Sequence, residues 1–106
     1  MVKVLDTKED FDSQVIGAAA DTLVVVDFFA TWCGPCVAIA PVLEELAENN
    51  TSVLFFKVDV DKNDETSGEC GITAMPTFQF YKGGVKVDEL RGADPATLAQ
   101  KVADLQ

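Results

Sequence analysis

The decapeptide Asp27-Phe28-Phe29-Ala30-Thr31-Trp32-Cys33-Gly34-Pro35-Cys36 links an apolar stretch to a stretch with helical periodicity. Residues 23–29 are apolar except for Asp27, are rich in β-branched side chains, and lack the alternation of a half-exposed strand. They therefore predict a central strand that is buried on both faces. The two cysteines lie where this buried strand passes into a helix.

That helix is predicted from about residue 33 to about residue 49. Its apolar side chains recur at helical spacing, and the glutamates between them should face water. Pro41 falls inside the pattern and predicts a kink, because proline lacks the N–H that a helix interior uses. The apolar positions are Ile39, Val42, Leu43 and Leu46.

Four further strands follow from periodicity and turn signals. Gly83-Gly84 indicates a two-residue hairpin turn, because both positions tolerate a positive φ. The predicted strands cover residues 2–5, 52–58, 77–82 and 85–91.

Three further helices are predicted around these strands. Residues 7–10 resemble a capping box, which favours a first helix. Asp94-Pro95 is a good N-cap and first-turn pair for a last helix, and the polar stretch 59–69 has room for a short one. The first helix should bury Phe11, Val15 and Ile16.

This order of elements predicts an α/β protein with a mixed sheet and helices on both faces. The strand–helix repeats of the first half require parallel strands and right-handed crossovers, and the hairpin adds an antiparallel edge. A chain of 106 residues suits one domain, 1–106, with a core of its own.

The composition and the net charge indicate which partners are disfavoured and which cellular compartment to expect. The chain has 8 basic and 18 acidic residues and a net charge of −10, which argues against nucleic acid or an anionic membrane as partner. No apolar run approaches the ~20 residues that span a bilayer, and residues 1–6 lack the pattern of a secretory signal. Three cysteines are too few for a secreted disulfide scaffold. We therefore expect a cytoplasmic protein.

Cys33 and Cys36 have the spacing of a redox-active pair. Three residues apart at the start of a helix, they place both sulfurs on one face, within the Cα separation that a disulfide permits. Cys33 should sit where free backbone N–H groups and the helix dipole favour a thiolate, the form that attacks disulfides. Cys33 is therefore the predicted nucleophile and Cys36 the resolving thiol.

Two other interpretations of the pair are part of a zinc site, or two inert thiols. A structural zinc site usually takes four Cys or His ligands. The chain has no histidine and only Cys70 besides the pair, so we expect no metal.

The decapeptide resembles the active-site segment of the thioredoxin family, and the resemblance continues along the whole chain. Pro41 matches the family's helix kink, and Met75-Pro76-Thr77 matches its cis-proline segment. Gly84 matches its hairpin glycine, and Gly92 matches the glycine after the last strand. The resemblance implies the thioredoxin fold, a mixed five-stranded sheet flanked by four helices.

The resemblance also implies a protein-disulfide reductase that acts on client proteins through a mixed disulfide and is re-reduced by a thioredoxin reductase. No cofactor is expected, because the dithiol is itself the redox centre, and we expect a monomer. Two other classes are a binding module of the same fold and an oxidant or isomerase of secretory compartments. The complete motif disfavours the first. The missing signal and the Gly34-Pro35 dipeptide disfavour the second.

Asp27 interrupts an apolar strand six residues before Cys33. From the pattern alone it is either a buried carboxyl with a raised pKa or a carboxylate at the wet end of the strand. The resemblance favours the first and implies a proton acceptor for Cys36, paired with Lys57 of the neighbouring strand. The other interpretation of Lys57 is a lysine at the strand edge that extends into solvent.

Several loop residues match the family's apolar docking surface, where an exposed patch marks an interaction site. A partner segment would lie extended there and hydrogen-bond to the backbone beside Pro76. The resemblance implies a cis peptide bond before Pro76, although trans is the safer expectation from sequence alone. The expected docking residues are Trp32, Gly34, Pro35, Met75, Pro76, Gly92 and Ala93.

Two residues stand apart from the family pattern. Many members carry a basic residue after the second cysteine, where this chain has Val37; this puts in doubt any electrostatic contribution from that position. Cys70 is either a small half-buried residue or the site of a regulatory or intermolecular disulfide.

Overall fold

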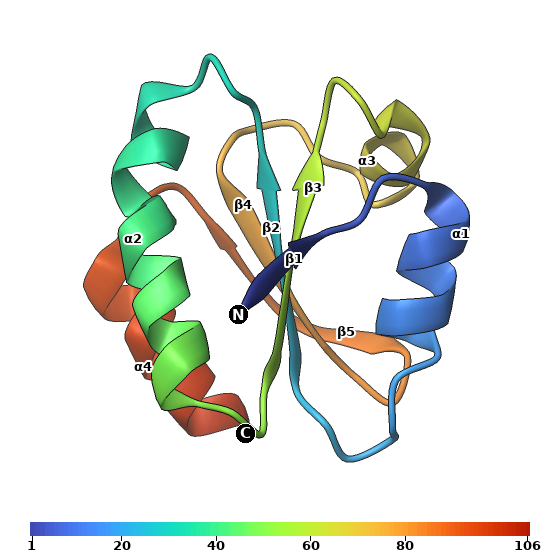
Figure 1. The fold of residues 1–106 in the computed structure, drawn as a ribbon, viewed down its shortest axis with the longest axis vertical. Coiled ribbons are helices and arrows are strands. Elements are labelled where there is room, and N and C mark those ends of the chain that lie inside the picture. The colour runs from blue at the N-terminus through green and yellow to red at the C-terminus, as the bar shows by residue number, and fades with distance from the viewer.

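The computed structural model describes residues 1–106 as five strands and four α-helices, which confirms the predicted mixed sheet (Figure 1). The strands are β1 (Val2–Val4), β2 (Val24–Phe29), β3 (Leu54–Asp59), β4 (Thr77–Lys82) and β5 (Val85–Arg91). The helices are α1 (Lys8–Phe11), α2 (Gly34–Asn49), α3 (Asp64–Glu69) and α4 (Pro95–Leu105). None of them is both long and apolar enough to cross a membrane.

The strands lie in the order β1-β3-β2-β4-β5. β3 pairs in parallel with both β1 and β2, whereas β4 runs antiparallel to β2 and to β5. The prediction of a parallel first half with an antiparallel hairpin edge is therefore confirmed. β2 lies at the centre, and its first five residues are buried, as its apolar character without alternation predicted.

Helices cover both faces of the sheet: α2 and α4 pack on one face, and α1 and α3 on the other (Figure 1). Each face has its own core cluster. The cluster under α2 and α4 includes Leu43, Phe78, Phe80, Leu98 and Val102. The cluster under α1 and α3 includes Phe11, Val15, Phe28, Phe56 and Tyr81.

The first helix differs from its prediction. After one α-helical turn it continues as a π-helical turn, η1 (Asp12–Ile16), in which the Gly17 N–H donates to the Asp12 carbonyl at 2.9 Å. The wider turn changes the direction of the side chains that follow. Phe11 and Val15 are buried as expected, but Ile16 is 40% exposed, so its assignment to the core was wrong.

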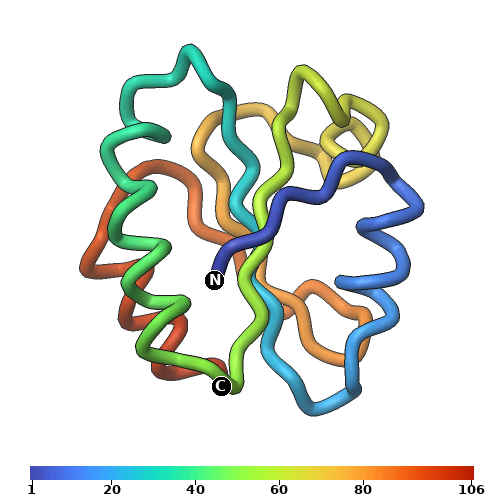
Figure 2. The backbone as a smooth tube through the Cα atoms, in the orientation of Figure 1, coloured from blue at the N-terminus to red at the C-terminus, as the bar shows by residue number.

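The backbone trace shows why one end of the sheet carries the candidate site (Figure 2). β2 and β3 are parallel neighbours, so the loops that follow them leave the sheet at the same end. Because β4 is antiparallel to β2, residues 70–76 approach its start from that same end. Segments far apart in sequence thus meet around Cys33.

Candidate active site

Cys33 and Cys36 form a disulfide, and their Cα atoms are 5.3 Å apart. Cys33 is the N-cap of α2, and its sulfur accepts a hydrogen bond from the Cys36 N–H at 3.2 Å. Pro35 occupies the first turn, where a missing donor costs little. The predicted position at the helix start is confirmed, and it places the Cys33 sulfur against free backbone donors and the positive end of the helix dipole.

Cys33 and Cys36 are both largely buried. Cys33 is 6% exposed and Cys36 is 3% exposed, and they pack together with Ala30. Phe29, Val60 and Met75 lie against this cluster. A disulfide that is to react with Cys33 must therefore fit closely against the surrounding loops.

Asp27 is fully buried in β2, and neither of its carboxylate oxygens has a hydrogen-bond partner. The alternative interpretation, a carboxylate at a solvent-exposed end of the strand, is therefore wrong. Burial disfavours the charged form and raises the pKa of Asp27 to about 7, although the charge of Lys57 lowers it in part. The chain thus holds a carboxyl group that changes its charge near neutral pH.

Lys57 lies beside Asp27 in the β2–β3 register, as its place in the neighbouring strand predicted. Its ammonium group lies 4.7 Å from the centre of the Phe29 ring and forms no ion pair with the Asp27 carboxylate. A cation over an aromatic face is stabilised by the ring's electrons. Lys57 therefore acts on Asp27 through its charge at a distance.

A cleft of about 240 Å³ opens beside Cys36. Val37 is 62% exposed and lines this cleft together with Lys57, so it presents an apolar side chain next to Cys36. The other lining residues are Phe29, Ala30, Thr31 and Ala40.

Trp32, which precedes Cys33, is an exposed aromatic side chain with a single polar contact. It is 68% exposed, and its indole N–H donates to a carboxylate oxygen of Asp61 at 2.8 Å. The loop that carries Asp61 is itself fixed, because the Asp59 carboxylate accepts the N–H groups of Asp61 and Lys62 at 2.9 and 3.3 Å. Asp61 thus orients the indole.

Sequence reasoning missed Asp61. The signal that could have found it is the parallel pairing of β2 with β3, because residues that follow two parallel neighbours meet at one edge of the sheet.

We expect that replacing Asp61 with alanine frees the Trp32 indole. The chain has one tryptophan, so its fluorescence reports on this side chain alone. The anisotropy of Trp32 should fall and its quenching by acrylamide should rise, because an exposed ring loses its only polar anchor. Asp61→Asn keeps an acceptor oxygen and should stay near wild type. Asp21→Ala removes an exposed carboxylate elsewhere and should change neither signal; if it did, net charge would explain the effect.

The Met75–Pro76 peptide bond is cis, as the resemblance implied. The Gly92 N–H donates to the Pro76 carbonyl at 2.8 Å, which brings Gly92 and Ala93 beside the Met75-Pro76 segment. Gly92 has a φ of +101°, which favours glycine at this position.

Cys70 is a free thiol that caps the C-terminus of α3. Its sulfur is 3.7 Å from the Tyr81 hydroxyl, and burial raises the pKa of Cys70. Since the thiolate is the reactive form, this environment favours the interpretation of Cys70 as a small half-buried residue.

Comparisons with known proteins agree over nearly the whole chain. The family model that describes thioredoxin matches residues 2–104. The thioredoxin of Geodia cydonium is 52% identical over 103 residues, which are 96% of each chain. Human thioredoxin is 46% identical over 105 residues, 99% of each chain. The crystal structure of Fasciola hepatica thioredoxin superposes with a TM-score of 0.94 at 44% identity and covers 98% of this chain and 99% of that one. The matched ranges include both cysteines of the motif.

Proposed function

The chain belongs to the thioredoxin family and is a thiol–disulfide oxidoreductase, and we propose that Cys33 attacks disulfides in client proteins while Cys36 resolves the resulting mixed disulfide. The observation that carries this assignment is the position of Cys33 as the N-cap of α2, with its sulfur accepting the Cys36 N–H. That environment stabilises negative charge on Cys33, so Cys33 is the better nucleophile of the pair.

The reaction has two exchange steps. In the first, the Cys33 thiolate attacks one sulfur of the client; a bond forms between Cys33 and that sulfur, and the client's other sulfur leaves as a thiolate and takes a proton. In the second, Cys36 gives up its proton and its thiolate attacks the Cys33 sulfur; the bond between Cys33 and the client breaks, and the client's sulfur leaves as a thiolate and takes a proton. The client leaves with two thiols, and the chain keeps the Cys33–Cys36 disulfide.

We propose that Asp27 accepts the proton from Cys36 in the second step, while the charge of Lys57 helps to set the pKa of Asp27. A general base is most effective when its pKa lies near the working pH, and burial raises the pKa of Asp27 to about 7. Its two oxygens are free of other hydrogen bonds, so the carboxylate has the capacity to take up a proton.

We propose a docking surface formed by Trp32, Gly34, Pro35, Met75, Pro76, Gly92 and Ala93. Trp32, Gly34, Pro35 and Ala93 are exposed, while Met75 lies against the two cysteines. A client segment would lie extended beside Pro76, with its sulfur over Cys33.

The proposed partners and compartment follow from the family and from the net charge of the chain. The electrons would come from a thioredoxin reductase, and the clients would be disulfide-containing proteins. The net charge of −10 supports neither nucleic acid nor an anionic membrane as partner. We propose a monomer of one domain, 1–106, that acts in the cytoplasm without a cofactor.

Reduction of insulin disulfides tests this function, first with dithiothreitol as reductant and then with NADPH and a thioredoxin reductase. We expect the chain to accelerate insulin reduction in both assays. Acceleration with dithiothreitol but not with NADPH and the thioredoxin reductase would show that this reductase does not supply the electrons. No acceleration in either assay would favour a binding module of the same fold.

A further inference from the structure

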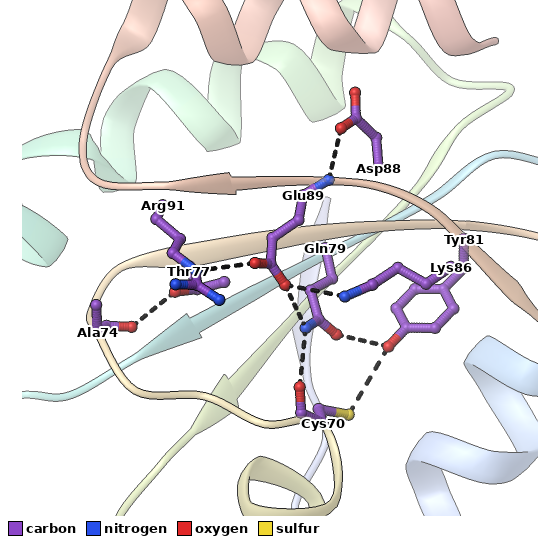
Figure 3. Close-up of polar contacts among 9 residues, drawn as sticks. All are labelled: Cys70, Ala74, Thr77, Gln79, Tyr81, Lys86, Asp88, Glu89 and Arg91. Carbon is purple, nitrogen blue, oxygen red and sulfur yellow. Dashed lines mark hydrogen bonds and ion pairs between the residues drawn. The ribbon is translucent and has the colours of Figure 1, made fainter.

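Gln79 is a buried polar residue in an otherwise apolar part of β4. It is 1% exposed and lies between Phe78 and Phe80, which are fully buried. Its side-chain oxygen accepts from the Tyr81 hydroxyl at 2.6 Å. Its side-chain nitrogen donates to the backbone carbonyl of Cys70 at 3.1 Å and to a Glu89 carboxylate oxygen at 2.9 Å (Figure 3). A buried amide with both its ends bonded holds its partners in one arrangement.

One of these bonds reaches the segment that leads to the docking surface. Residues 70–76 connect α3 to β4 and end in Met75-Pro76. Two side chains of β4 hold this segment: Gln79 binds its first carbonyl, and the Thr77 hydroxyl donates to the Ala74 carbonyl at 2.7 Å (Figure 3).

The bond to Glu89 leads to the second segment of the docking surface, Gly92-Ala93. The second carboxylate oxygen of Glu89 accepts from the Arg91 side chain at 2.9 Å, and Arg91 ends β5 immediately before Gly92 and Ala93. Hydrogen bonds from Gln79, Lys86 and Arg91 lower the pKa of Glu89, so its carboxylate stays charged and keeps these partners. Gln79 is thus the side chain that joins the two segments (Figure 3).

We infer that Gln79 is a positioning residue for client docking: its amide joins residues 70–76 to Glu89 of β5, which binds the Arg91 side chain immediately before Gly92 and Ala93. This inference rests on the proposed docking surface. Gln79 lies outside the Cys33–Cys36 cluster, so its loss should weaken the fit of a protein client without changing the thiol chemistry.

The test compares two disulfides that differ in their need for docking. Reduced protein is mixed with oxidised insulin or with hydroxyethyl disulfide, and the second-order rate constant is measured by acid quench and mass spectrometry. Gln79→Met keeps the length of the side chain and removes its hydrogen bonds. The rate with insulin should fall about three- to tenfold, the effect of one or two lost hydrogen bonds, while the rate with hydroxyethyl disulfide stays at the wild-type value.

Two further variants keep the test decisive. Tyr81→Phe removes a hydroxyl from the same network but leaves both braces in place, so it should lower the melting temperature without changing either rate constant. Glu89→Ala alters a partly exposed side chain and should fold even if Gln79→Met does not; it should cause a smaller loss with insulin only.

The inference is overturned if both rate constants fall together, if neither changes, or if Tyr81→Phe slows insulin as much as Gln79→Met. A wild-type chain that reacts with hydroxyethyl disulfide but not with insulin would instead contradict the proposed function.

Discussion

Cys36→Ser is expected to trap a client protein covalently on Cys33, and Cys33→Ser is expected to abolish disulfide reduction. The reason is the order of the two exchange steps: without Cys36 the mixed disulfide forms but is not resolved, and without Cys33 it does not form. Non-reducing gel electrophoresis and mass spectrometry would identify the adduct. Insulin reduction by Cys33→Ser should fall to the rate of the reductant alone.

Cys70→Ser is the matched control, because it removes the third thiol without touching the pair. It should keep wild-type activity and should form no adduct. Trapping that survives Cys33→Ser and requires Cys36 would reverse the roles assigned to the two cysteines.

Asp27→Ala is expected to stabilise the protein at neutral and alkaline pH. Burial raises the pKa of Asp27 from 3.8 to about 7, so the folded state binds the proton more tightly than the unfolded state. Stability therefore falls as the pH rises from about 3.8 to about 7, and the full penalty remains above that range. That penalty is about 4 kcal/mol at most, from the span between the two pKa values.

Denaturant unfolding of the oxidised protein across pH measures this effect. The gain from Asp27→Ala should be largest above pH 7 and should disappear as the pH falls below 3.8, where the carboxyl group becomes neutral in both states. Asp27→Asn also removes the charge but leaves polar atoms without partners, so it should gain less. Destabilisation by Asp27→Ala at alkaline pH would contradict the argument from burial.

The same substitution should slow the second exchange step. Single-turnover reduction of insulin should show slower resolution of the mixed disulfide in Asp27→Ala, by about tenfold. This is less than a general base usually contributes, because the cleft beside Cys36 gives solvent a second route to the proton. Resolution at the wild-type rate would remove Asp27 from proton transfer, even if the stability result holds.

The features that were predictable from sequence are those that depend on patterns of residues close together in the chain. The apolar run of β2, which only Asp27 interrupts, predicted its central position, and the Gly83-Gly84 pair predicted the hairpin between β4 and β5. The place of Cys33 and Cys36 at a helix start followed from the change of periodicity alone. These patterns depend on neighbours within a few residues, so no tertiary information was needed.

The residues that were missed depend on contacts between distant segments. Asp61 meets Trp32 across 29 positions of sequence, and Gln79 reaches Cys70 and Glu89 from a strand that reads as apolar. Lys57 was placed in the correct strand, but its contact with the Phe29 ring depends on side-chain packing. Ile16 was misplaced because the π-helical turn departs from the regular period.

We propose that Cys33 is the activated nucleophile, and the pH dependence of iodoacetamide alkylation of the reduced protein tests this role. Peptide mapping by mass spectrometry separates the three cysteines. We expect Cys33 to be alkylated first, with a pKa below the ordinary thiol value of about 8.5, while Cys36 and Cys70 react slowly. Alkylation of Cys36 before Cys33, or a pKa of Cys33 at or above the ordinary value, would contradict it.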